Sequence, residues 1–416
     1  MARLDYARKR RMLIYAVALL IGVCCIVLSA CNKDAGVYDV SDKGATLEVN
    51  HFIAKFINIL YEGIGNIGWT VVAFTVILKL ILSPLDIWQK MITRKNAKAM
   101  ERMKPQLEIL QAKYGDDKQK FQQEQMALYK REKYSTFGAC LPTIVTLVVF
   151  FVIFAGFREM VGWKYANDYQ DCYNVYDQAM TAELGREDWE NEANAELFAA
   201  AKDKAQTAVY EFYYDDAQVE SRSFLWIKNV FVPDGWQKAV PDFLTVTGQQ
   251  GMVTSKITGV QIDEYEDVMG KVLGTGGWAE EDGKWNGFLI LPILSLALSV
   301  ISQKLMSAAQ GTGEKKEKKT FKQRIEKLKN LGAPAPAQQQ ANGKEKKPDQ
   351  AQASMKMMQY MMPVITAVFA LMYSSAFALY MLVSSLTSTL FQLAFNLVFK
   401  IVDKKKAQNP VAKKAR

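Results

Sequence analysis

Long apolar runs alternate with polar segments along the chain and divide it into membrane-spanning and water-exposed parts. An α-helix needs about 20 apolar residues to cross the hydrocarbon core of a bilayer. Runs of this kind cover residues 12–30, 66–88, 137–158, 287–305, 357–375 and 377–399. The pattern predicts an all-α polytopic membrane protein with five core spans that follow an N-terminal signal or anchor helix.

Charge differs strongly between the segments that separate these runs. Residues 90–133 contain 12 Lys or Arg against 6 acids, residues 306–356 contain 12 against 5, and residues 400–416 contain 7 against 1. Residues 159–286 contain 24 acids against 10 bases. Because Lys and Arg are enriched in cytoplasmic loops, we expect the three basic segments inside the cell and the acidic one outside. The net charge of +9 then indicates topology and attraction to anionic lipids, with ribosomal RNA as the alternative partner of the basic tail.

The polar segments predict distinct parts on the two sides of the membrane. We expect a signal peptide or signal anchor with a lipobox at 1–31, an extracytoplasmic segment with an amphipathic helix at 32–65, a cytoplasmic helical hairpin at 89–134, an extracytoplasmic insertion domain at 159–286, a cytoplasmic linker at 306–356 and a basic cytoplasmic tail at 400–416. Aromatic residues are too frequent in the insertion for a disordered loop, because it holds six of the eight tryptophans.

The expected hairpin has apolar side chains at helical spacing on both of its arms. The turn between the arms is the polar stretch 114–117, which contains a glycine. We predict that the seam between the arms is formed by Met91, Met100, Met103, Leu107 and Leu110 on the first arm and by Phe121, Met126, Leu128 and Tyr129 on the second.

The N-terminus has the three parts of a secretory signal: a basic stretch, an apolar stretch and small residues before a cysteine. Residues 28–31 resemble a bacterial lipobox, so we expect lipid on Cys31 and the mature N-terminus outside. The alternative is a retained signal anchor with a chance cysteine. Apolar residues at helical spacing from Val49 to Ile64 predict an amphipathic helix, which either lies on the outer leaflet or packs against the outer domain.

The residues typical of metal, redox and nucleotide sites are scarce or wrongly spaced. Five cysteines show no metal-ligand or redox spacing, and His51 is the only histidine. The chain also has no GxxxxGK[ST] phosphate loop. We therefore expect no metal, no cofactor and no enzymatic activity.

Lys79 stands near the middle of the expected span 66–88, with Thr75 one helical turn before it. An ammonium group at that depth costs several kcal/mol, on the order of 3, unless it meets water or a partner. We expect no Asp or Glu within the five core spans to neutralise it, so hydration is the simplest remedy. Polar side chains of other spans that can line the same hydrated site are Gln303, Tyr380, Ser384, Ser385, Ser388 and Gln392.

Several segments, taken together, resemble the core of the YidC/Oxa/Alb family of membrane protein insertases. They occur in the order and spacing of that family at 68–84, 115–118, 126–130, 137–142, 224–227, 291–294, 361–364 and 379–384. The resemblance implies a five-helix insertase core with a hydrophilic groove that opens to the cytoplasm and to lipid. It also implies that Lys79 stands at the groove position where the family usually has arginine, so the charge is kept and the planar donor fork is lost.

The resemblance implies that the chain inserts nascent membrane proteins into the bacterial plasma membrane. The implied partners are nascent chains, with the Sec translocon and the ribosome as further candidates and no small-molecule substrate. Two features depart from the family: the turn 373–376 has no Pro or Gly, and the outer region is much longer than usual.

Three other functions compete with insertion. A secondary transporter would bind an anionic substrate at Lys79, but it predicts two similar halves with broken helices, which are not evident. An intramembrane enzyme would use Ser384 or Cys140 as a nucleophile, yet neither has a His or Asp partner in the spans. A lipoprotein adhesin or sensor would act through the external domain.

Overall fold

The computed structural model of the chain describes residues 36–114, 117–132, 134, 136–185, 194–236, 238–249, 256–274, 285–309 and 363–408. The expected signal segment with Cys31, most of the expected linker 306–356 and the end of the basic tail lie outside these residues.

Three described helices are long and apolar enough to cross a membrane: α3 (Ile67–Tyr114), α5 (Thr136–Leu184) and α13 (Ser375–Gln408). Two shorter apolar helices accompany them, α10 (Ile290–Ala309) and the helix Pro363–Met372. The prediction of an all-α polytopic membrane protein is confirmed, while the five-span core stays a prediction.

Helix α3 joins two parts that the sequence pattern separates. It runs for 48 residues, so the expected span 66–88 continues without a break into the first arm of the expected hairpin. Pro84 lies inside it, although proline removes one backbone hydrogen bond and disfavours a helix interior. Helix α5 likewise runs for 49 residues, well beyond the end of the expected span at residue 158.

The chain divides into two compact units. The first contains the described residues up to Thr93, those from Thr136 to Ser299 and those from Ile365 to Phe391. The second contains those from Arg94 to Ser135, from Val300 to Val364 and from Gln392 onward.

The second unit contains a helical hairpin formed by the end of α3 and by α4 (Lys118–Arg131). Asp117 caps α4, because its carboxylate accepts a hydrogen bond from the Lys120 N–H at 3.0 Å. Buried side chains from both arms form its core, which consists of Ala99, Met100, Met103, Leu107, Leu128 and Tyr129, with Leu110 and Tyr134 packed against it. The predicted seam is wrong at Met91 and Met126, which are 54% and 49% exposed.

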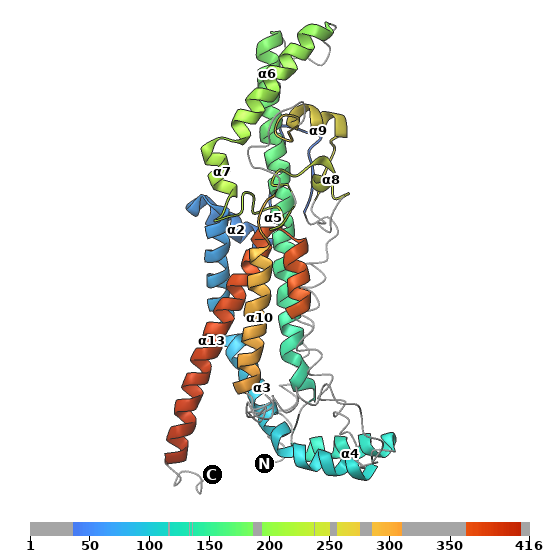
Figure 1. Cartoon of the computed structure of the whole chain (residues 1–416), viewed down its shortest axis with the longest axis vertical. Coiled ribbons are helices and arrows are strands. Elements are labelled where there is room, and N and C mark those ends of the chain that lie inside the picture. The colour runs from blue at the N-terminus through green and yellow to red at the C-terminus, as the bar shows by residue number, and fades with distance from the viewer. Residues whose placement is uncertain are drawn as a thin grey trace, which may run out of the picture. The chain divides into compact units, whose positions relative to one another are not determined.

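In the first unit, the N-terminal arm and the insertion fold together around α5. Strand β1 (Val37–Asp39) pairs in parallel with β2 (Lys256–Thr258), which lies in the insertion. Helix α6 (Ala195–Tyr213) packs along α5, as Figure 1 shows, and the short helices α7 (Asp216–Arg222), α8 (Phe243–Val246) and α9 (Ile262–Met269) complete the insertion. One apolar core continues from the spans into this domain.

A buried carboxylate attaches the N-terminal arm to α5. Glu159 is 3% exposed and accepts hydrogen bonds from the backbone N–H groups of Asn50 and His51, the latter at 2.8 Å. Further along α5, the Trp163 indole donates to the Leu47 carbonyl at 2.9 Å. These contacts fix the segment that leads into α2 (Phe52–Ile64).

Helix α2 buries one face against α5 and exposes other apolar side chains. Ile53 and Ile57 are buried, and the approach to α5 is so close that a Cβ at Gly156 would overlap Ile53. Phe52 and Ile59 are 61% and 64% exposed. Of the two arrangements expected for this helix, packing against its own chain therefore accounts for one face, and the exposed face is available to lipid.

Candidate functional site

Lys79 lies on α3, twelve residues after the helix begins at Ile67. Its side chain is half-buried, whereas its neighbours Leu80 and Ile81 are 57% and 64% exposed and therefore suited to contact lipid. Thr75, one turn earlier, is fully buried, and its hydroxyl donates to the Val71 carbonyl of the same helix at 2.6 Å. Lys79 is thus positioned between an apolar surface and a tightly packed interior.

The expectation that no acidic residue accompanies Lys79 in the core spans is wrong. Asp86 lies inside the expected span 66–88, seven residues after Lys79. Seven residues differ from two full helical turns by only about 20°, so both charges lie on one face. The Asp86 carboxylate acts electrostatically on the ammonium groups of both Lys79 and Lys90. The spacing was visible in the sequence, and it identifies Asp86 as a further residue of the site.

Helix α13 contributes four of the predicted polar residues to the first unit: Tyr380, Ser384, Ser385 and Ser388. Tyr380 is buried, its hydroxyl interacts with the Ser384 side chain, and the Asp86 carboxylate acts on it electrostatically. The hydroxyl groups of Ser385 and Ser299 lie 3.4 Å apart and connect α13 with α10. Helices α3 and α13 approach each other at the rings of Phe74 and Tyr380, whose centres lie 6.5 Å apart, and the Asp86 carboxylate is near enough to act on Tyr380 electrostatically.

The other predicted polar residues are only partly gathered. Gln303 and Gln392 belong to the second unit, so they are not assigned to the Lys79 site. The Gln392 amide donates to Asn396 at 2.9 Å, which extends the polar face of α13 beyond the predicted residues. The side-chain oxygen of Gln303 is buried without a hydrogen-bond partner among the described residues. Ser388 is half-buried on α13.

Four buried aromatic rings form a cluster around Phe74, which precedes Lys79 on α3. Phe74 is within 6.0 Å of the Phe157 ring centre and 6.5 Å of the Tyr380 ring centre. Phe377 packs against both Phe157 and Tyr380, at 5.7 and 5.8 Å. This cluster joins α3, α5 and α13 through buried aromatic rings. The part of α3 that precedes Lys79 is therefore packed mainly against apolar surface.

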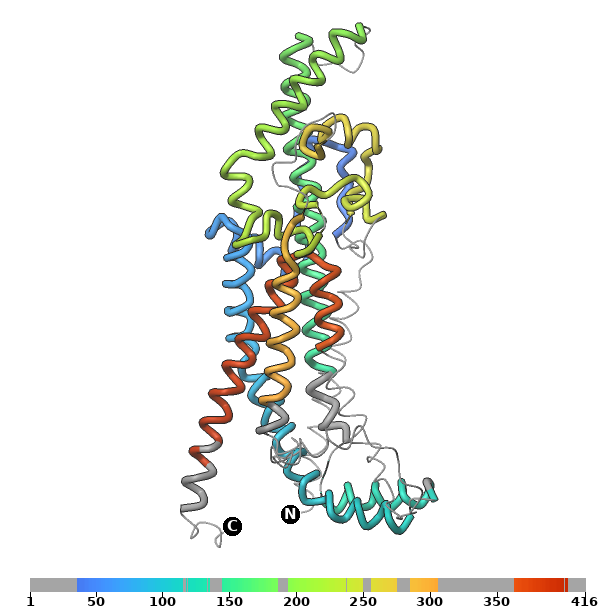
Figure 2. The backbone as a smooth tube through the Cα atoms, in the orientation of Figure 1, coloured from blue at the N-terminus to red at the C-terminus, as the bar shows by residue number. Residues whose placement is uncertain are grey.

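Beyond the aromatic cluster, one segment covers the N-terminal ends of three helices. We call residues 220–236 the capping segment, which Figure 2 shows in yellow-green above the orange α10 and the red α13. At α3, the Asn66 amide donates to the carbonyls of Glu220 and Ser223, at 2.7 and 3.0 Å. At α13, the Ser375 N–H and hydroxyl both donate to the Val232 carbonyl, at 2.9 and 2.6 Å.

The capping segment also caps the N-terminal end of α10 through a buried carboxylate. Asp234 is fully buried and accepts hydrogen bonds from the N–H groups of Leu289 and Leu291, at 3.0 and 2.8 Å. Such contacts satisfy backbone donors that a helix leaves open at its start. The Asn286 amide fastens the segment further by donating to the carbonyls of Asn229, Val232 and Pro233. The helix ends are therefore closed on this side by satisfied backbone polar groups.

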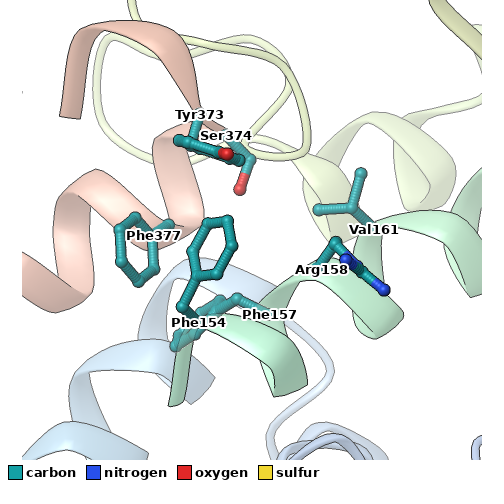
Figure 3. Close-up of a pocket in the computed structure, with 7 residues that line it drawn as sticks. All are labelled: Phe154, Phe157, Arg158, Val161, Tyr373, Ser374 and Phe377. Carbon is teal, nitrogen blue, oxygen red and sulfur yellow. The ribbon is translucent and has the colours of Figure 1, made fainter. Parts of the chain in front are cut away.

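A small apolar cavity of about 10 Å³ lies beside the aromatic cluster and not at Lys79. Its lining residues, which Figure 3 shows, are Phe154, Phe157, Arg158, Val161, Tyr373, Ser374 and Phe377. They come from α5, from the turn that precedes α13 and from the first turn of α13, and they offer little polar surface. The cavity is therefore a packing gap of the capped end and is unsuited to hold a polar substrate.

Comparison with protein families identifies the group to which this arrangement belongs. The family described as 60Kd inner membrane protein, which includes YidC, Oxa and Alb proteins, matches residues 59–404. The match includes α3, the hairpin, most of the described insertion, α10 and α13 as far as residue 404. The chain belongs to this family. Membership in the 60Kd inner membrane protein family and the apolar helices together make the chain a multi-pass bacterial membrane protein.

Curated relatives match a shorter stretch than the family comparison does. Proteins named "Membrane protein insertase YidC" are 40% identical over 110 residues in Stenotrophomonas maltophilia (strain K279a), covering 26% of this chain and 19% of the relative. The protein of that name in Paracoccus denitrificans is 39% identical over 105 residues, 24% of this chain and 15% of the relative. The protein of that name in Pseudoalteromonas atlantica is 30% identical over 126 residues, which cover 30% of this chain and 22% of the relative. The chain thus matches about a fifth of the length of these relatives.

Proposed function

We propose that the chain is an insertase that moves nascent membrane proteins into the bacterial plasma membrane through a hydrophilic, positively charged groove. The observation that carries the proposal is the half-buried Lys79 on α3, with polar residues of α13 on one side and the closed, aromatic end of the helices on the other. Family membership supports the same function, since the relatives are named insertases.

In this proposal, the groove opens to the cytoplasm and is closed outside by the capping segment. A short hydrophilic end of the substrate enters the groove, where Lys79 attracts its acidic groups and holds water. Water in the groove hydrates the cytoplasmic half of the membrane locally and lowers the free-energy barrier to translocation of that polar end. The barrier is otherwise high because an unsolvated polar group in hydrocarbon costs several kcal/mol, on the order of 3. Burial of the substrate's apolar helix in lipid then drives the remaining transfer. The protein itself consumes no nucleotide and needs no cofactor.

The topology belongs to the same proposal. The hairpin α3–α4 and the basic tail face the cytoplasm, where they meet the nascent chain, anionic lipids and, as candidate partners, the ribosome and the Sec translocon. The insertion faces outward. Cys31 carries a lipid and becomes the first residue outside the membrane, and Gly36, the first described residue, then follows it after only five positions.

Reconstitution tests the proposed activity directly. The full chain is placed in phosphatidylethanolamine and phosphatidylglycerol vesicles, and a single-span substrate with a short acidic N-terminal tail is synthesised beside them. We expect the tail to become protected from external protease only in vesicles that contain the chain, without added ATP. Equal protection in empty vesicles would contradict the proposal. Protection that occurs only when ATP is added to vesicles containing the purified chain would contradict it as well.

A further inference from the structure

Three charged residues of α3 form a single stripe. Asp86 follows Lys79 by seven residues, and Lys90 follows Asp86 by four. Since each residue turns the helix by 100°, Lys79 lies about 20° from Asp86 and about 20° from Lys90, and Lys90 lies about 40° from Asp86 once full turns are subtracted. All three side chains are half-buried. The stripe therefore presents charges in the order positive, negative, positive from the middle of the span toward its C-terminal end.

The electrostatic interactions along the stripe centre on Asp86. Its carboxylate attracts both ammonium groups, and the two lysines repel one another. The Asp86 carboxylate also acts electrostatically on the buried Tyr380 of α13. Yet neither Lys79 nor Asp86 has an ion-pair partner within 4 Å among the described residues. Asp86 thus acts on Lys79 through space and not through a direct ion pair.

We infer that Asp86 is a specificity-determining residue, whose carboxylate opposes the approach of acidic substrate segments to Lys79. The inference rests on the proposed function, because it concerns the substrates that the same groove accepts. A substrate carboxylate that travels along the stripe meets attraction at Lys90, repulsion at Asp86 and attraction at Lys79. Neutral polar tails feel none of these forces. Asp86 therefore reduces the preference for acidic tails that Lys79 and Lys90 would otherwise produce.

The stripe makes a definite prediction about a pair of matched substrates. Two single-span substrates differ only in three tail positions, which are Asp in one and Asn in the other. The measured quantity is the ratio of protected Asp-tail to protected Asn-tail substrate in vesicles that contain the full chain. We expect Asp86→Asn to raise this ratio roughly tenfold, the scale for unit charges about 12 Å apart at an effective dielectric near 20. We expect Lys79→Gln to lower the ratio toward one.

Two control variants separate this role from a structural one. Asp86→Glu keeps the charge and should keep the wild-type ratio. Asp263→Asn removes one negative charge from the exposed surface of α9, so its ratio should not change. A purely structural defect at Asp86 would reduce both substrates equally and leave the ratio unchanged.

The outcomes distinguish this inference from the proposed function. If Asp86→Asn leaves the ratio unchanged while Lys79→Gln lowers it, the selectivity of Asp86 is refuted and the positively charged groove stands. An Asp86→Glu variant that behaves like Asp86→Asn also refutes it, because charge is then not the cause. If no vesicle preparation protects either substrate, including wild type, the proposed function itself fails.

Discussion

The carboxylate of Asp234 accepts a hydrogen bond from the Leu291 N–H at 2.8 Å, and both residues are buried. Through this contact, a loop of the insertion caps the N-terminal end of the apolar helix α10. The same loop binds the first residues of α13 and the residue that precedes α3. The insertion is therefore built into the capped end of the helices and is not an appended domain.

Removing the Asp234 carboxylate should destabilise the capped end. Asp234→Ala leaves the N–H groups of the half-buried Leu289 and the buried Leu291 without an acceptor, at a cost of about 1.5–3 kcal/mol for bonds to a charged group. Asp215→Ala is the matched control, because Asp215 caps the short α7 at an exposed position and should cost only about 0.5–1 kcal/mol. Thermal unfolding in detergent micelles measures both, and equal losses would show that the Asp234 contact has no special importance.

A methyl group at Gly68 should displace the capping segment from α3. The Phe224 ring packs directly on Gly68, so the added Cβ of Gly68→Ala would overlap the ring and cost about 1–3 kcal/mol. Gly63→Ala in α2 provides the control, since its Cβ would meet nothing within 4 Å and should stabilise the helix by about 0.5–1 kcal/mol. Unfolding temperatures that rise in both variants would contradict the close packing of Phe224 on α3.

His51 is the only histidine in the sequence, so its contribution to the pH dependence of stability can be removed by a single substitution. Burial lowers the pKa of His51 below its usual 6.5, and the nearby Glu159 carboxylate opposes part of that shift. As pH falls below about 6.5, the unfolded chain takes up this proton before the folded chain does, so stability is lost. His51→Asn keeps a side-chain acceptor at the start of α2. We expect wild type to lose more stability than this variant between pH 7.5 and pH 5.5, and identical pH profiles would refute the prediction.

The hairpin core should depend on Met103 and not on Met126. Met103 is fully buried between the two arms, so Met103→Ala should cost about 2–5 kcal/mol of local stability. Met126 is 49% exposed, and its replacement by Ala should change stability by less than about 0.5 kcal/mol. Hydrogen exchange of the α4 amides reports the difference. Similar exchange in both variants would contradict the packing of these two helices.

Local patterns in the sequence predict the helices well, because apolar length and helical spacing are properties of neighbouring residues. Met103 and Leu128 are examples, since their spacing identifies the buried faces of the hairpin. Long-range contacts are not readable in this way. Val37 pairs with Lys256, and Asp234 caps a helix that begins more than fifty residues later. No periodicity within either segment specifies such a partner.

The charged stripe shows a different reason for an incomplete prediction. Lys79 is recognisable because a charge in an apolar run is costly, and the sequence also places Asp86 seven residues later, on the same face of the helix. Asp86 stands near the end of the expected span in the sequence. Helix geometry nevertheless places it on the same face of α3 as Lys79. The polar residues of α13 are readable as a set, but their division between two compact units depends on tertiary packing.

Complementation of an insertase-depleted bacterium with Lys79 variants tests the positively charged groove most directly. Insertion of a small single-span substrate is scored for wild type, Lys79→Arg, Lys79→Ala and Lys79→Glu at equal protein level. Arginine keeps the charge at this position, so wild type and Lys79→Arg should restore insertion while Lys79→Ala and Lys79→Glu should not. Full rescue by Lys79→Ala would contradict the proposal that a positive charge on α3 draws the substrate into the membrane.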